Sequence, residues 1–457
     1  MEFTAWSLFV DVGIVSFLLV IGTLLRAKVK FIQSLFLPAS MIAGFLGLLL
    51  GPSGVNILPF SDQIATYPGV LIAVIFGAIP IGASKVPWKK LAGRVRNMWS
   101  YSMLLTVLMW GGGALFGLAI LNVIFNDLHV GFGLILGAGF LGGHGTAAAL
   151  GQGFAIQGWE EALTLGMTSA TIGMVVAVLG GLFLIKRSTQ KGHTSFISSF
   201  NDLPQELKTG LVSRKNRKAL GDDTISPISI DPLIFHVALV SLVVAGAYFL
   251  TNFGNSLFPQ IAIPLFSIAF LLGLFLQFVL RKTKSDDYVD QRIITRISGG
   301  ATDLLVAFGI ASINIAVVVE YAVPLLALFV FGIIWAYCIF RFVAPRLFDN
   351  YWFERAIFGW GWSTGTVAMG LALLRIVDPE LKSKTLDDYA ISYLGMVPPE
   401  MLIITMAPIL FSIGLPWVFP VTLLLTGIII ILIYKKKGWW VTEDPFNRTQ
   451  SQDSKSA

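Results

Sequence analysis

Residues 141–151 have the sequence LGGHGTAAALG, a stretch of small residues inside a strongly apolar part of the chain. Glycines allow sharp bends and close backbone approach, but they destabilise the interior of a helix. At membrane depth, irregular backbone is tolerated only where it is buried in protein or lines a cavity. The stretch therefore predicts a broken, re-entrant segment whose free backbone amides and carbonyls face a ligand.

A second stretch, residues 361–370, repeats this pattern with the sequence GWSTGTVAMG. Residues 144–148 (HGTAA) align with residues 364–368 (TGTVA), so a Gly-Thr pair occupies the same place in both. We expect the rest of the chain to hold the two stretches against each other.

The composition indicates a membrane protein. Of the 457 residues, 55% are hydrophobic and only 13% are charged, whereas soluble domains carry about 25% charged residues. The single cysteine, Cys338, excludes an intrachain disulfide and a cysteine metal site. The N-terminal residues lack the basic region of a signal peptide, so we expect the first apolar run to remain as a helix.

Eleven apolar runs approach the length of about 20 residues that a membrane-spanning helix needs. Five precede a polar segment and six follow it, and the two glycine-rich segments are counted separately. The runs are 6–25, 34–51, 64–83, 99–125, 163–185, 232–250, 258–280, 299–319, 323–342, 389–414 and 416–434.

The distribution of charge predicts how these runs cross the membrane. We place the N-terminus outside and make each glycine-rich segment, about 130–155 and about 356–375, a hairpin that returns to the side it left. All 32 lysines and arginines then lie on the cytoplasmic side, and the outer loops contain only acidic charges. This is the distribution that the positive-inside rule describes. The net charge of +6 is accordingly interpreted as a topology signal rather than as a nucleic-acid surface.

The same arrangement makes the first half begin outside and the second half begin inside. We therefore predict an all-α integral membrane protein with two inverted-topology repeats of five helices, each with one re-entrant hairpin, an architecture of secondary transporters. The C-terminus is expected in the cytoplasm. The predicted parts are a first repeat 1–187, a cytoplasmic linker 188–231, a second repeat 232–414, an extra helix 415–437 and a tail 438–457.

Hydroxyl groups and unwound backbone carbonyls in both hairpins suit a sodium ion, which prefers oxygen ligands. Thr146 and Thr366 are the leading candidates because they occupy matching positions in the two repeats. The alternative is that serines and threonines at helix interfaces serve only packing and hydrogen bonding. The full set of sodium-binding candidates is Thr146, Thr168, Ser169, Thr171, Thr366, Asn314 and Glu400.

A substrate carboxylate fits the positive ends of helices that begin near Thr146 and Thr366. Arg375 offers a bidentate partner for the carboxylate, or it is an interfacial arginine paired with Asp378. His144 serves either proton coupling or the capping of free backbone groups. The substrate-binding candidates are Gly143, His144, Gly145, Thr146, Ser363, Thr364, Gly365, Thr366 and Arg375.

Asp303 and Glu400 are acidic residues within apolar runs, and burying such groups is costly enough to make them functional candidates. Asp303 lies close enough to a run's end to be interfacial. Glu400 follows two prolines that interrupt helix hydrogen bonding. Glu400 is therefore the better candidate for binding or coupling a cation.

Three motifs give the chain a family resemblance. The most specific is GGHGT at residues 142–146 with the alanines that follow, the second is ATIG at 170–173 followed by Gly180-Gly181, and the weakest is Pro38 followed by Ala43-Gly44. Over roughly residues 17–414 the chain resembles the bacterial sodium/glutamate symporter family. The resemblance implies sodium-driven uptake of an anionic amino acid such as glutamate by a homodimer in the bacterial inner membrane. It also implies an elevator-like mechanism, in which a transport part carrying the hairpins moves against a scaffold.

The remaining interpretations differ in the coupling ion or the class of protein. A proton-coupled carrier, or one for another organic anion, would give Glu400 and His144 a larger role. An ion channel is disfavoured because channels commonly assemble repeated filters around one axis. The chain lacks a Walker-type nucleotide-binding sequence and the usual protease and esterase motifs, so we expect no enzyme and no cofactor besides Na⁺ as the coupling ion. The expected partners are the substrate, Na⁺ and the lipid bilayer, with no nucleic acid.

Overall fold

The computed structural model describes residues 4–34, 37–82, 95–196, 209–217, 219–257, 264–379 and 381–441. Within these ranges every regular element is a helix. Nine helices are long and apolar enough to cross a membrane, and two shorter apolar helices, α3 and α4, have 12 and 15 residues. This confirms the prediction of an all-α, multi-pass membrane protein.

The helices of the first half are α1 (Ala5–Lys28), α2 (Lys30–Ser34), α3 (Ala39–Leu50), α4 (Tyr67–Ile81), α6 (Arg96–Phe116), the π-helix η1 (Gly117–Leu121), α7 (Asn122–Ile124), α8 (Leu134–Leu136), the π-helix η2 (Gly137–Leu141), α9 (Gly143–Ala155) and α10 (Glu161–Gln190). A short 3-10 turn, η4 (Arg214–Asn216), lies in the segment that joins the halves.

The second half contains α12 (Pro232–Leu257), α13 (Leu265–Thr283), the 3-10 turn η5 (Ser285–Tyr288), α14 (Gln291–Ala311), α15 (Ile315–Glu320), α16 (Ala322–Phe342), α17 (Ala344–Leu347), α18 (Trp352–Thr364), α19 (Val367–Val377), α20 (Thr385–Ser412) and α21 (Val418–Lys436). The apolar run predicted over 258–280 is thus helical from Leu265, and residues 258–263 lie outside the described ranges. The run predicted over 299–319 is divided between α14 and α15.

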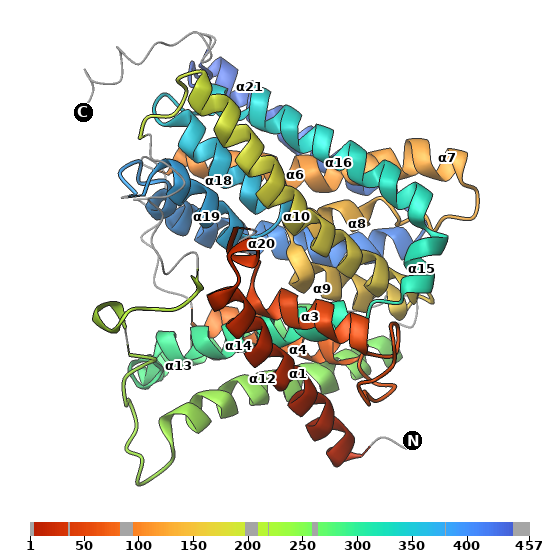
Figure 1. Ribbon diagram of the computed structural model, residues 1–457, viewed down its shortest axis with the longest axis vertical. Helices are drawn as coiled ribbons and strands as arrows, with labels where there is room; N and C mark the ends of the chain where they lie inside the picture. Colours follow the sequence, from red (N-terminus) through yellow and green to blue (C-terminus); the bar gives the residue numbers. More distant parts are fainter. Residues whose placement is uncertain are drawn as a thin grey trace.

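The helices form two groups, one below the other in Figure 1. The α4 group consists of α1, α3, α4, α12, α13 and α14. Within it, α1 packs on α3 and α12 on α13, while α3 packs on α14 and α13 on α4. The hairpin group consists of α6, α8, η2, α9, α10, α16 and α18–α21. In it, α10 packs on both α9 and α18, and α21 packs along α6.

Large apolar side chains cover the outside of the α4 group. Phe9 on α1 and Phe249 on α12 are each 70% exposed, and similar residues follow along the same helices. Soluble proteins rarely expose contiguous apolar surface of this kind, which instead marks contact with a membrane or a partner. The core of the hairpin group, by contrast, is fully buried around aromatic residues such as Trp110 and Phe140.

A buried carboxylate joins α1 to the loop before α4. Asp11 is 1% exposed and accepts hydrogen bonds from the backbone N–H and hydroxyl of Ser61 and from the hydroxyl of Tyr67, the last at 2.6 Å. Its acceptor sites are therefore satisfied by donors rather than by a basic side chain, as burial of a charged group requires.

The described end of the linker docks on the start of α14. Asp290 caps this helix by accepting from the backbone N–H of Arg292 at 2.6 Å, and its other oxygen accepts from the backbone N–H of Asp222 at 2.7 Å. Its own backbone N–H donates to Nε2 of the buried His236 at 2.8 Å. Burial alone would raise the pKa of Asp290, but these backbone donors and the Arg292 guanidinium outweigh burial and lower the pKa.

Candidate functional site

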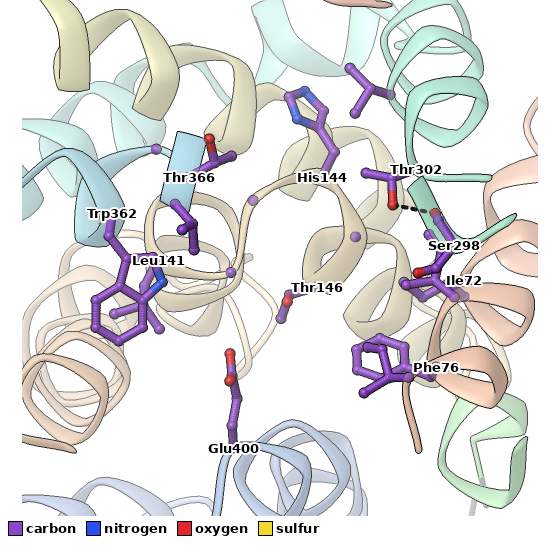
Figure 2. A pocket seen from close by; sticks show the side chains of 18 of the residues that line it. Ile72, Phe76, Leu141, His144, Thr146, Ser298, Thr302, Trp362, Thr366 and Glu400 are labelled. Carbon is purple, nitrogen blue, oxygen red and sulfur yellow. Dashed lines mark hydrogen bonds between the residues drawn. The ribbon is translucent and has the colours of Figure 1, made fainter. Parts of the chain in front are cut away.

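A cavity of about 530 Å³ lies between the two helix groups. The α4 group contributes side chains of α3, α4 and α14, and the hairpin group contributes both hairpins, α10 and α20. Figure 2 shows these elements surrounding the space, with Ile72 and Phe76 of α4 on one side and Trp362 of α18 on the other. A cavity of this size suits a small molecule, because ligand pockets are typically about 300–1,000 Å³.

The two glycine-rich stretches meet at this cavity. Gly143 has a left-handed backbone (φ +65°), and a Cβ built there would lie 3.5 Å from the Gly365 carbonyl oxygen and 3.5 Å from Cγ2 of Thr366. In the second stretch, a Cβ on Gly361 would lie only 2.7 Å from Cα of Gly370, so α18 and α19 pack backbone to backbone. The small residues thus allow each segment to fold back on itself and bring the two breaks together.

Two helices begin at the cavity wall. The first is α9, which starts at Gly143, three residues before the start near Thr146 that the sequence predicts. The second is α19, which starts at Val367 with Thr366 as its N-cap, and the Thr366 hydroxyl accepts from the Met369 N–H at 3.4 Å. Helix N-termini carry free N–H groups and a partial positive charge. The cavity wall therefore presents two places that suit a carboxylate.

The hydroxyl candidates separate into two sets. Thr146 and Thr366 line the cavity, together with Gly143, Gly145 and Gly365. Ser363 and Thr364 do not line it, and both donate back to the Trp360 carbonyl, at 3.3 and 2.7 Å. Hydroxyls that bond to the preceding turn in this way are satisfied within the helix.

His144 is held by a short chain of hydrogen bonds. The Thr171 hydroxyl donates to the Met167 carbonyl at 2.8 Å, so it accepts from Nε2 of His144 at 3.1 Å. A hydroxyl has only one proton to donate, which fixes the neutral His144 tautomer with its proton on Nε2. His144 is 2% exposed, and Nδ1 has no hydrogen-bond partner within the described residues. His144 is among the residues that line the cavity.

Two carboxylates line the cavity. Asp303 comes from α14 and Glu400 from α20, and Figure 2 shows the Glu400 carboxylate pointing into the space toward Thr146. No lysine or arginine is among the residues that line the cavity in the described parts of the chain. The acidic groups at the cavity wall are therefore the side chains of Asp303 and Glu400, and the positive potential there comes from the N-terminal ends of helices.

The other predicted residues lie elsewhere. Arg375 is in the last turn of α19 and does not line the cavity. Asp378, its suggested partner, is buried and accepts from the backbone N–H groups of Lys382 and Ser383 at 2.9 and 2.8 Å. Asn314 is exposed at the N-cap of α15, where its side chain accepts from the Ala316 N–H at 3.0 Å.

Two candidates on α10 also lie outside the cavity lining. Thr168 donates to the Thr164 carbonyl at 2.8 Å. Ser169 is fully buried against Gly139 of η2, and its hydroxyl has no hydrogen-bond partner within the described residues. Of the predicted α10 residues, only Thr171 reaches the site, through its bond to His144.

Several residues that the sequence did not single out also line the cavity. They are Ser40 at the start of α3, Ser298 and Thr302 on α14, and Tyr393 on α20, with Trp362 as an aromatic wall. Tyr393, Val397 and Glu400 follow one another at helical spacing, which is the sequence pattern that would have placed them on one face. Ser298, Thr302 and Val306 on α14 also follow one another at helical spacing.

Comparison with known families gives one match. The family model described as sodium/glutamate symporter matches residues 6–362, which include the first hairpin and end within α18. A search of curated proteins found no match. The family match therefore covers all of the elements around the cavity except the second break, α19 and α20.

Proposed function

Because the chain belongs to the sodium/glutamate symporter family, which comprises transporters rather than enzymes, we propose that it couples an inward sodium gradient to the uptake of glutamate or a related small carboxylate. Membership implies Na⁺ and glutamate as the transported species and a multi-pass membrane protein. The proposal adds the site and the mechanism.

The observation that carries the proposal is the cavity between the two hairpin breaks. It has room for a small amino acid, and the N-termini of α9 and α19 supply N–H groups for carboxylates. For sodium, Thr146, Thr366 and the unwound backbone at Gly365 supply oxygen atoms at the same cavity. Glu400 lines the same cavity.

The packing of the helices supports alternating access between inverted repeats. Contacts occur in matching pairs: α1 on α3 resembles α12 on α13, and α3 on α14 resembles α13 on α4. Such reciprocity is expected when two repeats with opposite topology assemble around a shared site. In an elevator-like mechanism the hairpin group would carry the site past the α4 group.

The α4 group is then the scaffold, and its exposed apolar surface suits lipid and a second copy of the chain. We propose a homodimer in a bacterial inner membrane, with an N-terminus outside and a cytoplasmic linker and C-terminus. A proton-coupled carrier is the alternative, and the positions of Glu400 and His144 at the cavity favour it over other classes.

The test is uptake of radiolabelled glutamate by proteoliposomes that contain the purified protein. An inward sodium gradient should drive accumulation, and replacing sodium by potassium should abolish it. Thr146→Val and Thr366→Val should each lower uptake, whereas Thr426→Val on α21, where the hydroxyl bonds only within its helix, should not. Accumulation driven by a proton gradient without sodium would instead support the alternative.

A further inference from the structure

We infer that Glu400 accepts the amino group of the substrate and thereby makes the cavity select amino acids over carboxylic acids of the same length. The inference deepens the proposed function and rests on it. It concerns which chemical groups of the substrate are recognised, a question that the assignment to a sodium-coupled carrier leaves open.

The Glu400 carboxylate is placed to bind a group inside the cavity. Figure 2 shows it projecting from α20 into the space, on the side opposite to Thr366. Within the described residues no hydrogen bond or salt bridge engages this carboxylate. By contrast, the buried Asp11, Asp290 and Asp378 each accept from backbone N–H groups. Glu400 is half-buried and its carboxylate opens onto the cavity, so a cationic group that enters the cavity meets an acceptor not already engaged by the described residues.

The surroundings of Glu400 favour an ammonium group as that partner. No lysine or arginine lines the described cavity, so the partner must enter with the ligand or as an ion. An ammonium has three donors and forms charge-assisted hydrogen bonds to a carboxylate. Two aromatic residues of the cavity wall, Trp362 and Tyr393, are also present, and aromatic faces attract ligand ammonium groups.

The polarity of the cavity matches an amino acid from end to end. The N-termini of α9 and α19 meet on one side, where Gly143 approaches Gly365 and Thr366. The Glu400 carboxylate projects into the same cavity from α20, which belongs to the same helix group. An amino dicarboxylate can place its two carboxylates at the two helix ends and its ammonium at Glu400. A dicarboxylate without the amino group leaves Glu400 without a partner. Sites built to bind a polar group discriminate strongly against ligands that lack it.

The test compares glutamate with glutarate, which has the same chain and both carboxylates but no amino group. Binding of each is measured as competition with radiolabelled glutamate and as thermal stabilisation, in sodium, for the full-length protein in detergent. In wild type, glutamate should bind at least about 30-fold more tightly than glutarate. Glu400→Gln should weaken glutamate by about 10- to 100-fold and leave glutarate within about threefold, because one charge-assisted contact is lost.

Asp303→Asn is the matched control, since Asp303 is the other carboxylate at the cavity but is exposed. It should leave the ratio of the two affinities unchanged. Glu400→Asp keeps the charge and should retain most of the preference for glutamate over glutarate. It is the variant to compare with wild type if Glu400→Gln does not fold. The inference is overturned if Glu400→Gln weakens both ligands equally, or if it shifts the sodium dependence of binding while the ratio stays at its wild-type value.

A failure of the proposed substrate is distinguishable from a failure of this inference. If wild type binds no glutamate, each of several α-amino acids is tested against the carboxylic acid that lacks its amino group. Selection of the amino acid, lost in Glu400→Gln, would retain the role of Glu400 with another substrate. Binding of only the acids without an amino group would refute it.

Discussion

Replacing Gly173 by alanine tests how tightly α10 holds the two hairpins. Gly173 is buried, and a Cβ there would lie 2.5 Å from the Thr364 carbonyl oxygen, 3.0 Å from Cδ1 of Phe140 and 3.2 Å from Cα of Phe140. Thr364 ends α18 and Phe140 belongs to η2, so one added methyl group presses on both hairpins. Ordinary contacts begin at 3.4 Å, which leaves the nearest contact about 0.9 Å too short.

The expected cost is set by overpacking. An extra methylene-sized group in a packed core lowers the free energy of unfolding by about 1–3 kcal/mol. The higher helix propensity of alanine offsets up to about 1 kcal/mol of this loss. If the strain falls on the arrangement that binds substrate, affinity should drop by about 5- to 150-fold. The two residues that must move, Thr364 and Phe140, lie behind the cavity and do not line it.

The assay pairs thermal unfolding in detergent with sodium-driven uptake in proteoliposomes. Gly13→Ala on α1 is the matched control, because nothing lies within 4 Å of a Cβ at that position. The control should be neutral or slightly stabilising and should transport normally. If Gly173→Ala is as stable and as active as Gly13→Ala, then the hairpins are not held by this contact and the packing argument is wrong.

Three further predictions concern stability and are checked by thermal unfolding. Asp11→Ala leaves three donors without an acceptor and should lower the free energy of unfolding by about 3 kcal/mol. Asp62→Ala, at an exposed site, should change it by no more than about 0.5 kcal/mol. Equal effects of the two substitutions would contradict the role of burial. The lowered pKa of Asp290 stabilises the fold fully above its ordinary value of 3.8, and this contribution is lost as pH falls through the lower folded pKa. The advantage of wild type over Asp290→Asn should therefore stay constant at higher pH and shrink as the pH falls below about 4, and a constant difference there would refute the assignment. Trp335 donates from Nε1 to the Leu108 carbonyl at 2.8 Å, so Trp335→Phe should cost about 1 kcal/mol, and no loss would show that this link between α16 and α6 is dispensable.

The helical content and the two broken segments could be predicted because their causes are local. Hydrophobic runs of membrane length form helices, and a Gly-Thr pair within such a run interrupts one. The prediction placed the start of α9 near Thr146, but the helix begins at Gly143 because this residue adopts the left-handed backbone. A sequence pattern shows that glycines are present, but which glycine turns depends on packing against Gly365 and Thr366.

The composition of the cavity depended on contacts between distant segments. The spacing of Ser298 and Thr302 places them on one face of α14, but that this face meets the cavity depends on the packing of α14 against α4, α9 and α3. Asn314 illustrates the opposite case. A polar residue in an apolar run suggested a buried ligand, but the run breaks there and the side chain caps the next helix.

Protection of one cavity residue from chemical labelling tests most directly whether the substrate binds between the hairpins. Cys338 is the chain's single cysteine, so Cys338→Ala provides a background for added cysteines. Val367, the first residue of α19, lines the cavity and is 36% exposed, and Ser412 at the end of α20 is an exposed control outside it. In protein shown to bind glutamate, sodium and glutamate together should slow thiol labelling of Val367→Cys on the order of tenfold and leave Ser412→Cys unchanged, as expected when a ligand buries most of its pocket. Saturating glutamate that leaves the labelling rate of Val367→Cys unchanged would place the substrate elsewhere and contradict the account.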